Sequence, residues 1–149
     1  MRRTADVTVV IAVYNMRQWL RSAVESVLSQ THEDFFLVIV DDGSTDGSLD
    51  SLHGLSDPRM LIVRQNNCGR SRARNRALAY AQGRFCAFLD ADDLWTAEHL
   101  DSACTLFEQY PDASVVFSPA VVMGTPAYSI PCASPCAKQL PPFDPLPHL

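Results

Sequence analysis

Residues 85–95 read FCAFLDADDLW, a short apolar run that passes directly into three carboxylates within four positions. The apolar run is bounded by glycine and by acid, and its shortness predicts a buried strand rather than a helix. Asp90, Asp92 and Asp93 then fall at the carboxyl end of that strand, the edge where open α/β sheets bind ligands. Three oxygen-rich side chains there favour Mg²⁺ or Mn²⁺ carrying substrate phosphates. The alternative is a solvated acidic turn that caps the next helix.

The composition is that of one ordinary globular domain. The chain has 149 residues, of which 47% are hydrophobic and 19% are charged, so it can bury a core. A formal net charge of -5 argues against a general nucleic-acid binder, whose surface would be basic. Five scattered cysteines indicate reduced thiols in a cytoplasmic protein, with peripheral contact to a membrane left open. We expect no signal peptide and no transmembrane segment, because no stretch approaches ~18 to 20 apolar residues.

Apolar runs and helical stripes alternate along the chain. Runs that are β-branched or continuously apolar predict strands over residues 7–13, 35–40, 60–63, 85–89 and 114–117. Helical spacing predicts helices over 17–30, about 49–55, 71–82 with Ser71 as cap, and from a cap at Thr96 to Pro111. This alternation implies right-handed crossovers and a parallel sheet with helices on both faces.

A second expected strand also ends in acid. Asp41 and Asp42 follow the run 35–40, and the turn-rich sequence GSTDG comes next at 43–47. Because the carboxyl ends of parallel strands lie at one edge of a sheet, we expect both groups of carboxylates at the same edge.

The amino-acid composition changes beyond Ser118, where eight of the ten prolines occur. Proline removes donors from a strand ladder, and this stretch has little apolar repeat to bury. We therefore expect one domain over residues 1–125 and an extended or disordered, proline-rich tail over 126–149.

Several common sites fit the sequence poorly. The turn after the first strand has no glycine, which argues against a dinucleotide site, and the only lysine, Lys138, lies in the tail, which excludes a P-loop. An EF-hand-like start at Asp42 has His53 where the twelfth position needs glutamate. A haloacid-dehalogenase-like phosphatase, which also has an Asp-x-Asp after a strand, remains the enzymatic alternative.

Four arginines alternate with other residues over 70–76, in the third expected helix. They are either a solvated helix surface or a contact for phosphate or nucleotide near a helix N-terminus, where backbone N–H groups favour anions. Cys132 and Cys136 would form half of a zinc site, but no second cysteine pair matches them.

Four motifs in order resemble the N-terminal half of family 2 glycosyltransferases. The resemblance implies the GT-A fold of nucleotide-diphospho-sugar transferases, Rossmann-like with a mostly parallel sheet, in a truncated form. They are VTVVIAVYN at 7–15, VDDGSTDG at 40–47, NNCGRSRARN at 66–75 and FLDADD at 88–93. The resemblance covers roughly residues 5–118, and four motifs with matching order and spacing are far more specific than any one of them.

The resemblance implies a nucleotide-sugar site at the strand ends. Ala12, Tyr14 and Asp42 would line the pocket for the nucleotide base, and Arg74 would help to hold the nucleotide. The full set of candidates for binding a nucleotide-diphosphate sugar, with a family-level preference for UDP-sugars, is Ala12, Tyr14, Asn15, Asp41, Asp42, Arg74, Asp90 and Ala91.

The resemblance also implies a divalent cation, Mn²⁺ or Mg²⁺. Asp90-Ala91-Asp92 matches the family's Asp-x-Asp motif, so Asp92 and Asp90 are the metal candidates. Asp92 would be the direct ligand of the ion bridging the diphosphate, with Asp90 near the ribose. Such an ion stabilises the charge that develops on the departing nucleoside diphosphate. Family members typically invert the anomeric centre, with an acidic residue taking the proton of the acceptor hydroxyl.

One departure from the family concerns the acceptor-binding half, which would follow the fifth strand. The chain instead gives proline-rich sequence there, so we identify no catalytic base. We expect a nucleotide-diphosphate sugar and a glycan or lipid-linked acceptor as partners of the intact enzyme. The alternative is a remnant module that binds a nucleotide sugar without transferring it.

Overall fold

In the computed structural model, the described residues are 5–121 and 129–130. They belong to two compact units, Met1–Ser102 and Ala103–Leu149. All of the candidate residues for nucleotide and metal belong to the first unit. The expected tail over 126–149 lies almost wholly outside the described residues, so the division into a domain and a tail stays a prediction.

The first unit is built on a four-stranded sheet in which all neighbouring strands are parallel. Along the sheet the order is β3-β2-β1-β4, so β3 and β4 are the outer strands. The strands are β1 (Val7–Val13), β2 (Phe35–Asp41), β3 (Met60–Arg64) and β4 (Phe85–Asp90). The expected parallel sheet is confirmed, and β1 has the predicted bounds.

The two central strands form the core of the sheet. Val9, Ile11, Leu37 and Ile39 are completely shielded from solvent. Their runs are apolar at nearly every position because both faces are covered, as expected for central strands of a parallel sheet. The outer strand β4 differs, since its Phe88 side chain stays 49% exposed.

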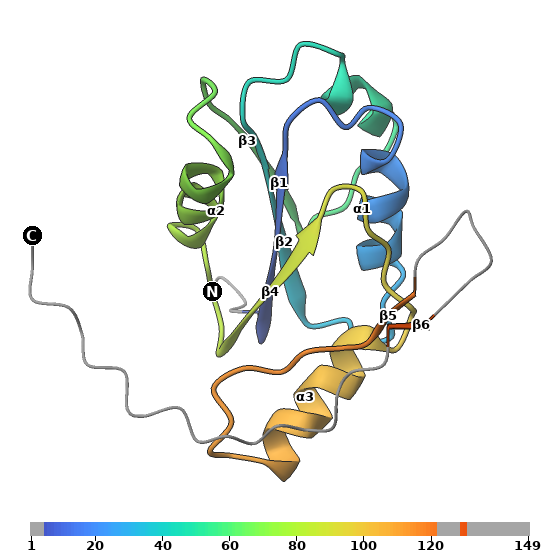
Figure 1. Cartoon of the computed structure of the whole chain (residues 1–149), viewed down its shortest axis with the longest axis vertical. Helices are drawn as coiled ribbons and strands as arrows, with labels where there is room; N and C mark the ends of the chain where they lie inside the picture. The colour runs from blue at the N-terminus through green and yellow to red at the C-terminus, as the bar shows by residue number, and fades with distance from the viewer. Residues whose placement is uncertain (1–4, 122–128, 131–149) are drawn as a thin grey trace, which may run out of the picture. The chain divides into compact units, whose positions relative to one another are not determined.

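Helices cover both faces of the sheet (Figure 1). On one face is α2 (Arg70–Leu78), whose Ala73 and Ala77 pack against Val10, Val38 and Val40. On the other face is α1 (Leu20–Leu28), which buries Leu20, Ala23, Val24 and Val27. Only alanine side chains separate α2 from the sheet, so the helix backbone lies close to it.

The helices are shorter than predicted, because tight turns take up their ends. The chain over 16–19 forms a turn before α1, where the Trp19 and Leu20 amides both donate to the Met16 carbonyl. After α2, the Tyr80 amide donates to the Ala77 carbonyl, again a turn instead of another helical bond. Ser71 does not cap α2, since Gly69 precedes the helix with no side-chain cap.

The described residues form two further helical segments. Residues predicted as a short helix over 49–55 form a 3₁₀ helix, η1 (Ser48–Leu52). The expected helix after Thr96 is α3 (His99–Gln109). Among the described residues, no helix is both long and apolar enough to cross a bilayer.

The predicted fifth strand over 114–117 is wrong. These residues pair with no strand, and Val115 and Phe117 are 57% and 76% exposed. A two-residue strand, β5 (Ala120–Val121), instead pairs antiparallel with β6 (Ser129–Ile130). The reason is that an apolar run makes a strand only where a partner is available for its ladder.

Candidate functional site

The carboxyl ends of β1, β2 and β4 form one row, because these strands are adjacent and parallel. Ala12 on β1 is level with Asp90 on β4, and Val13 is level with Asp41 on β2. The Asp42 amide continues this row by donating to the Val13 carbonyl at 2.9 Å. The structure therefore brings both acidic strand ends to one edge, as the sequence predicts.

Several of the predicted residues share the side of this edge that α2 covers. Val10 packs against α2, and side chains alternate along a strand, so Ala12 faces the same side. Asp90 joins it, being level with Ala12 and in contact with Arg74 of α2. Tyr14, just beyond β1, is 46% exposed and leaves this edge open to solvent.

Asn15 and Asp41 hold the loop that follows β2. The Asn15 side-chain oxygen accepts a hydrogen bond from the Thr45 amide at 2.8 Å, and the Asn15 amide donates to Ser44 Oγ at 3.0 Å. Asn15 adopts a left-handed backbone with φ 54°, a conformation that asparagine tolerates better than most residues. Asp41 Oδ1 accepts from the Ser44 amide at 3.0 Å. Both residues thus shape the site through its loops.

Asp42 is buried and accepts three hydrogen bonds from the loop that precedes α2. Its Oδ1 accepts from Gln65 Nε2 at 2.7 Å and from the Cys68 amide at 2.8 Å, and its Oδ2 accepts from the Gly69 amide at 2.8 Å. Burial alone would raise the pKa of Asp42, but these hydrogen bonds outweigh it and leave the pKa below its ordinary value. We call this arrangement of Asp42, Gln65, Cys68 and Gly69 the Asp42 clasp.

Arg74 of α2 forms an ion pair with Asp90. Arg74 Nη2 lies 2.6 Å from Asp90 Oδ1, and each side chain remains more than a third exposed. The Arg74 guanidinium also lies 6.0 Å from the centre of the Phe88 ring. This pair places a cation beside the acidic strand end, where a ligand's phosphate could replace part of its contact with Asp90.

Asp92 and Asp93 lie exposed in the turn after β4, which closes through a 3.1 Å bond from the Asp93 amide to the Asp90 carbonyl. Ala91 between the acids is buried. Partial removal from water raises the pKa of Asp93, and the charges of Asp92 and Asp90 raise it further. The Asp93 carboxylate is therefore repelled by both of its acidic neighbours, and a divalent cation would relieve that repulsion.

The carboxylates fit a cation shared with a ligand better than one held by protein alone. Within the described residues, oxygens of Asp90, Asp92 and Asp93 do not all approach within 4.8 Å of one another. Mg²⁺ is usually bound by one or two carboxylates together with substrate phosphates. Since Asp90 is paired with Arg74, Asp92 is the carboxylate best able to act as a direct ligand.

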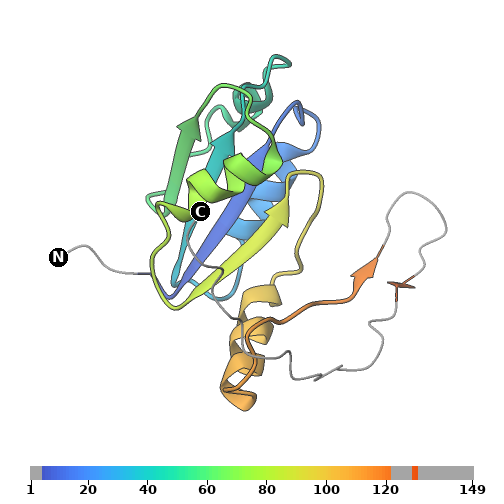
Figure 2. The same cartoon turned by 60° about the vertical axis from the view of Figure 1, so that its left-hand side comes forward.

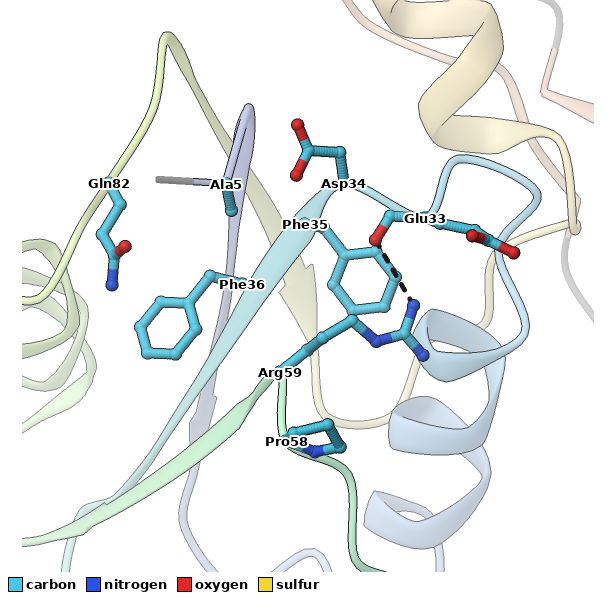
Figure 3. Close-up of a pocket in the computed structure, with 8 residues that line it drawn as sticks. All are labelled: Ala5, Glu33, Asp34, Phe35, Phe36, Pro58, Arg59 and Gln82. Atoms are coloured by element: carbon cyan, nitrogen blue, oxygen red, sulfur yellow. Dashed lines mark hydrogen bonds between the residues drawn. The ribbon is translucent and has the colours of Figure 1, made fainter. Parts of the chain in front are cut away.

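A pocket of about 500 Å³ lies at the opposite, amino-terminal edge of the sheet (Figure 3). In it Arg59 lies over the Phe35 ring, 4.2 Å from its centre, and pairs with Asp57 at 2.8 Å. The residues that line it are Ala5, Glu33, Asp34, Phe35, Phe36, Pro58, Arg59 and Gln82. None of them is a predicted site residue, so this pocket is separate from the strand-end site.

Sequence reasoning missed the donors of the Asp42 clasp. Gln65 had no motif to signal it, and the amides of Cys68 and Gly69 act through the backbone, which side-chain identity does not reveal. Gly69 was the one available signal, because its φ of 90° is a conformation that glycine adopts readily.

The fold is that of an α/β protein whose candidate site is a set of polar side chains at the carboxyl ends of parallel strands. The model of the family "Glycosyl transferase family 2" matches residues 8–131. The chain therefore belongs to family 2 of the glycosyltransferases, as the four motifs predict. Because the chain belongs to this family, the alternative of a haloacid-dehalogenase-like phosphatase is no longer needed.

Similarity to named proteins and to solved structures supports this family assignment. An Escherichia coli protein named UDP-Glc:alpha-D-GlcNAc-diphosphoundecaprenol beta-1,3-glucosyltransferase WfaP is 39% identical over 103 residues, 68% of this chain and 41% of that protein. The structure of Staphylococcus aureus TarS 1-349 with UDP-GlcNAc matches with TM-score 0.66 and 27% identity, over 71% of this chain and 32% of that one. The Pyrobaculum calidifontis mannosyltransferase PcManGT with GDP-Man and Mn²⁺ matches with TM-score 0.64 and 26% identity, over 70% and 32%.

These matches confirm the GT-A, Rossmann-like fold of the sheet and its helices. The chain spans 41% of the length of the E. coli relative and about a third of each solved chain.

Proposed function

We propose that this chain binds a UDP-sugar together with a divalent cation at the carboxyl ends of β1, β2 and β4. The observation that carries the proposal is the meeting of Asp42, the Arg74–Asp90 ion pair and Asp92 at one open edge of the sheet. An acceptor for a base, a cation and a free carboxylate are the three groups that a nucleoside diphosphate with a metal ion requires.

Asp42 would recognise the base. A carboxylate has about four acceptor positions, and the Asp42 clasp uses three, two of them on Oδ1. The remaining position on Oδ2 suits the imide N–H of uracil. Ala12 and Tyr14 on the same side would provide the adjoining surface. The complex of TarS with UDP-GlcNAc, a structural relative of this chain, supports a uridine nucleotide.

Asp92 would hold Mn²⁺ or Mg²⁺, with Asp90 beside it near the ribose. When bound, the ion would neutralise the diphosphate and stabilise the charge on it as it leaves. Arg74 adds a fixed cation on the α2 side, held in place by Asp90 at 2.6 Å. The Mn²⁺ in the PcManGT complex supports a metal of this class.

For the whole transferase, the proposed reaction is inverting transfer of the sugar to a hydroxyl of a glycan or lipid-linked acceptor. The name of the E. coli relative, whose acceptor is a diphosphoundecaprenol, supports the lipid-linked class and a role in building the cell envelope. The alternative function is binding of the nucleotide sugar alone. Glycosyl transfer to an added acceptor, assayed with radiolabelled UDP-sugar, distinguishes the two.

Calorimetric titration with UDP tests the binding proposal. With Mn²⁺ we expect saturable binding, and with chelator none. Asp92→Asn should weaken binding by about 1.5–3 kcal/mol, roughly 10- to 100-fold, as is typical for loss of a charged contact. Asp93→Asn is the matched control, because it removes a neighbouring carboxylate that we do not assign to the metal. Equal losses in the two variants, or undiminished binding in chelator, would contradict the metal assignment.

A further inference from the structure

The charges of this acidic chain are unevenly distributed. Between Asp57 and Asp90 the sequence has no acid and seven arginines, whereas the rest of the chain has five cations and all 17 acids. The seven arginines are Arg59, Arg64, Arg70, Arg72, Arg74, Arg76 and Arg84. A net charge of -5 thus conceals one strongly basic segment centred on α2.

Most of the basic charge on α2 faces solvent. The helix buries only Ala73 and Ala77, while Arg70, Arg72 and Arg76 are exposed. Within the described part of the chain, these three arginines make no ion pair and no side-chain hydrogen bond. Figure 2 shows α2 lying across the outside of the sheet.

Helical geometry separates the arginines of α2 into two pairs. Arg70 and Arg74 are one turn apart on one flank of the buried alanines, and Arg72 and Arg76 are one turn apart on the other flank. Arg74 is committed to Asp90 at the candidate site. Arg72 and Arg76 lie on the flank away from it, so the nucleotide site gives no account of them.

We propose that the outer face of α2 docks on an anionic phospholipid bilayer. This α2 basic face consists of Arg72 and Arg76 with Leu78 and Tyr80, which are 40% and 37% exposed at the end of the helix. Arginines complement anionic headgroups, and tyrosine and leucine suit the boundary between headgroup and acyl chain. Because charges are screened within about 8 Å at physiological ionic strength, the acids on the α1 side do not cancel this attraction.

The choice of a bilayer over a nucleic acid rests on the proposed function. A lipid-linked acceptor of the kind named for the E. coli relative is anchored in a membrane, so its transferase must reach that surface. The α2 helix begins at Arg70, directly after the Asp42 clasp. A bilayer against α2 would therefore lie beside the open edge of the nucleotide site.

Vesicle sedimentation with the full chain tests the proposal. We expect binding to vesicles of phosphatidylcholine and phosphatidylglycerol at 0.1 M salt, none to phosphatidylcholine alone, and release at 0.5 M salt. Each basic residue near such a surface is worth about fivefold in partitioning. The double variant Arg72→Gln/Arg76→Gln should therefore bind roughly 25-fold more weakly. Its circular dichroism spectrum and melting temperature should be those of the wild type, since both side chains are exposed.

Arg21→Gln is the matched control for Arg72→Gln. Arg21 is an exposed arginine on α1, on the opposite face of the sheet, so its loss changes net charge equally but should alter vesicle binding less than twofold. Equal losses in these two single variants would overturn the proposal, as would failure of the wild type to bind anionic vesicles. Displacement of bound vesicles by a duplex DNA 20-mer at equal charge concentration would also overturn it, in favour of a nucleic acid.

A UDP titration on the same proteins separates this proposal from the proposed function. Arg72→Gln/Arg76→Gln should retain the wild-type affinity for UDP with Mn²⁺. Vesicle binding without any UDP binding would refute the nucleotide site while supporting the α2 basic face. UDP binding without vesicle binding would refute the membrane contact alone.

Discussion

Asp42 is a buried carboxylate whose charge is held by three donors, so its ionisation should affect stability. Asparagine at this position keeps one acceptor oxygen and turns an NH₂ group toward backbone amides that need an acceptor. A hydrogen bond to a charged group contributes about 1.5–3 kcal/mol. We expect Asp42→Asn to lower the free energy of unfolding at pH 7 by that amount, measured by urea denaturation. Asp41→Asn, which loses an acceptor for only the Ser44 amide, should have a smaller effect.

The pH dependence of that effect follows from the lowered pKa of Asp42. A carboxyl group with a depressed pKa in the folded state stabilises the protein above its unfolded pKa, near 3.9, and loses this contribution as pH falls through its folded pKa. The stability difference between wild type and Asp42→Asn should therefore be largest at pH 7 and shrink below about pH 4. A difference that is unchanged at pH 3 would show that the charge of Asp42 contributes nothing.

Substitution of Arg74 should affect ligand binding much more than stability. Its ion pair with Asp90 is partly exposed, and such pairs contribute about 0–1 kcal/mol. Arg74→Gln should thus leave the free energy of unfolding within about 1 kcal/mol of wild type, while UDP affinity in Mn²⁺ falls about tenfold through loss of a charged contact. Arg76→Gln, a neighbour on α2 without such a pair, should change neither quantity. A large loss of stability in Arg74→Gln would assign Arg74 a structural role.

At the scale of elements, the strands that can be predicted best from the sequence are those buried on both faces of the sheet. The run 7–13 is apolar except for Thr8 because β1 is a central strand, and its bounds are predicted correctly. The run 114–117 is equally apolar but has no partner strand, and pairing cannot be deduced from one segment alone. The Asp42 clasp was beyond prediction for a similar reason, since its donors depend on the conformation of the loop over 65–69.

The contact between α2 and the sheet depends on small side chains. Ala77 is fully buried against the central strands, so Ala77→Leu must displace the helix or distort the core. Overpacking of this kind typically costs about 1–3 kcal/mol. We expect Ala77→Leu to lower the free energy of unfolding by that amount and to weaken UDP binding, because α2 carries Arg74. Ala79→Leu introduces the same side chain at an exposed position and should change both by little. Similar effects from both variants would mean that α2 does not pack as described.

At the scale of the molecule, the proposed site draws on four separated segments of the first unit. They are residues 12–15, 41–48, 65–74 and 90–93, which come from three strand ends and the start of α2. A ligand that contacts all of them binds only when the sheet and α2 are assembled. Binding should therefore stabilise the entire unit and not one loop alone.

Thermal unfolding of the full chain with and without ligand measures this coupling. A ligand at 100 times its dissociation constant that binds only the folded state adds about 2.7 kcal/mol, which raises the melting temperature by roughly 5 to 10 °C for a chain of this size. We expect that shift with UDP and Mn²⁺ together, and a much smaller one with Mn²⁺ alone or with UDP in chelator, because Asp92 and the diphosphate share the ion. ADP with Mn²⁺ should shift the melting temperature less, since adenine has no imide N–H to donate to Asp42 Oδ2. Asp92→Asn should remove most of the shift and Asp93→Asn should retain it. If ADP and UDP gave equal shifts, Asp42 would have no part in choosing the base, and the diphosphate and its metal would account for all of the binding.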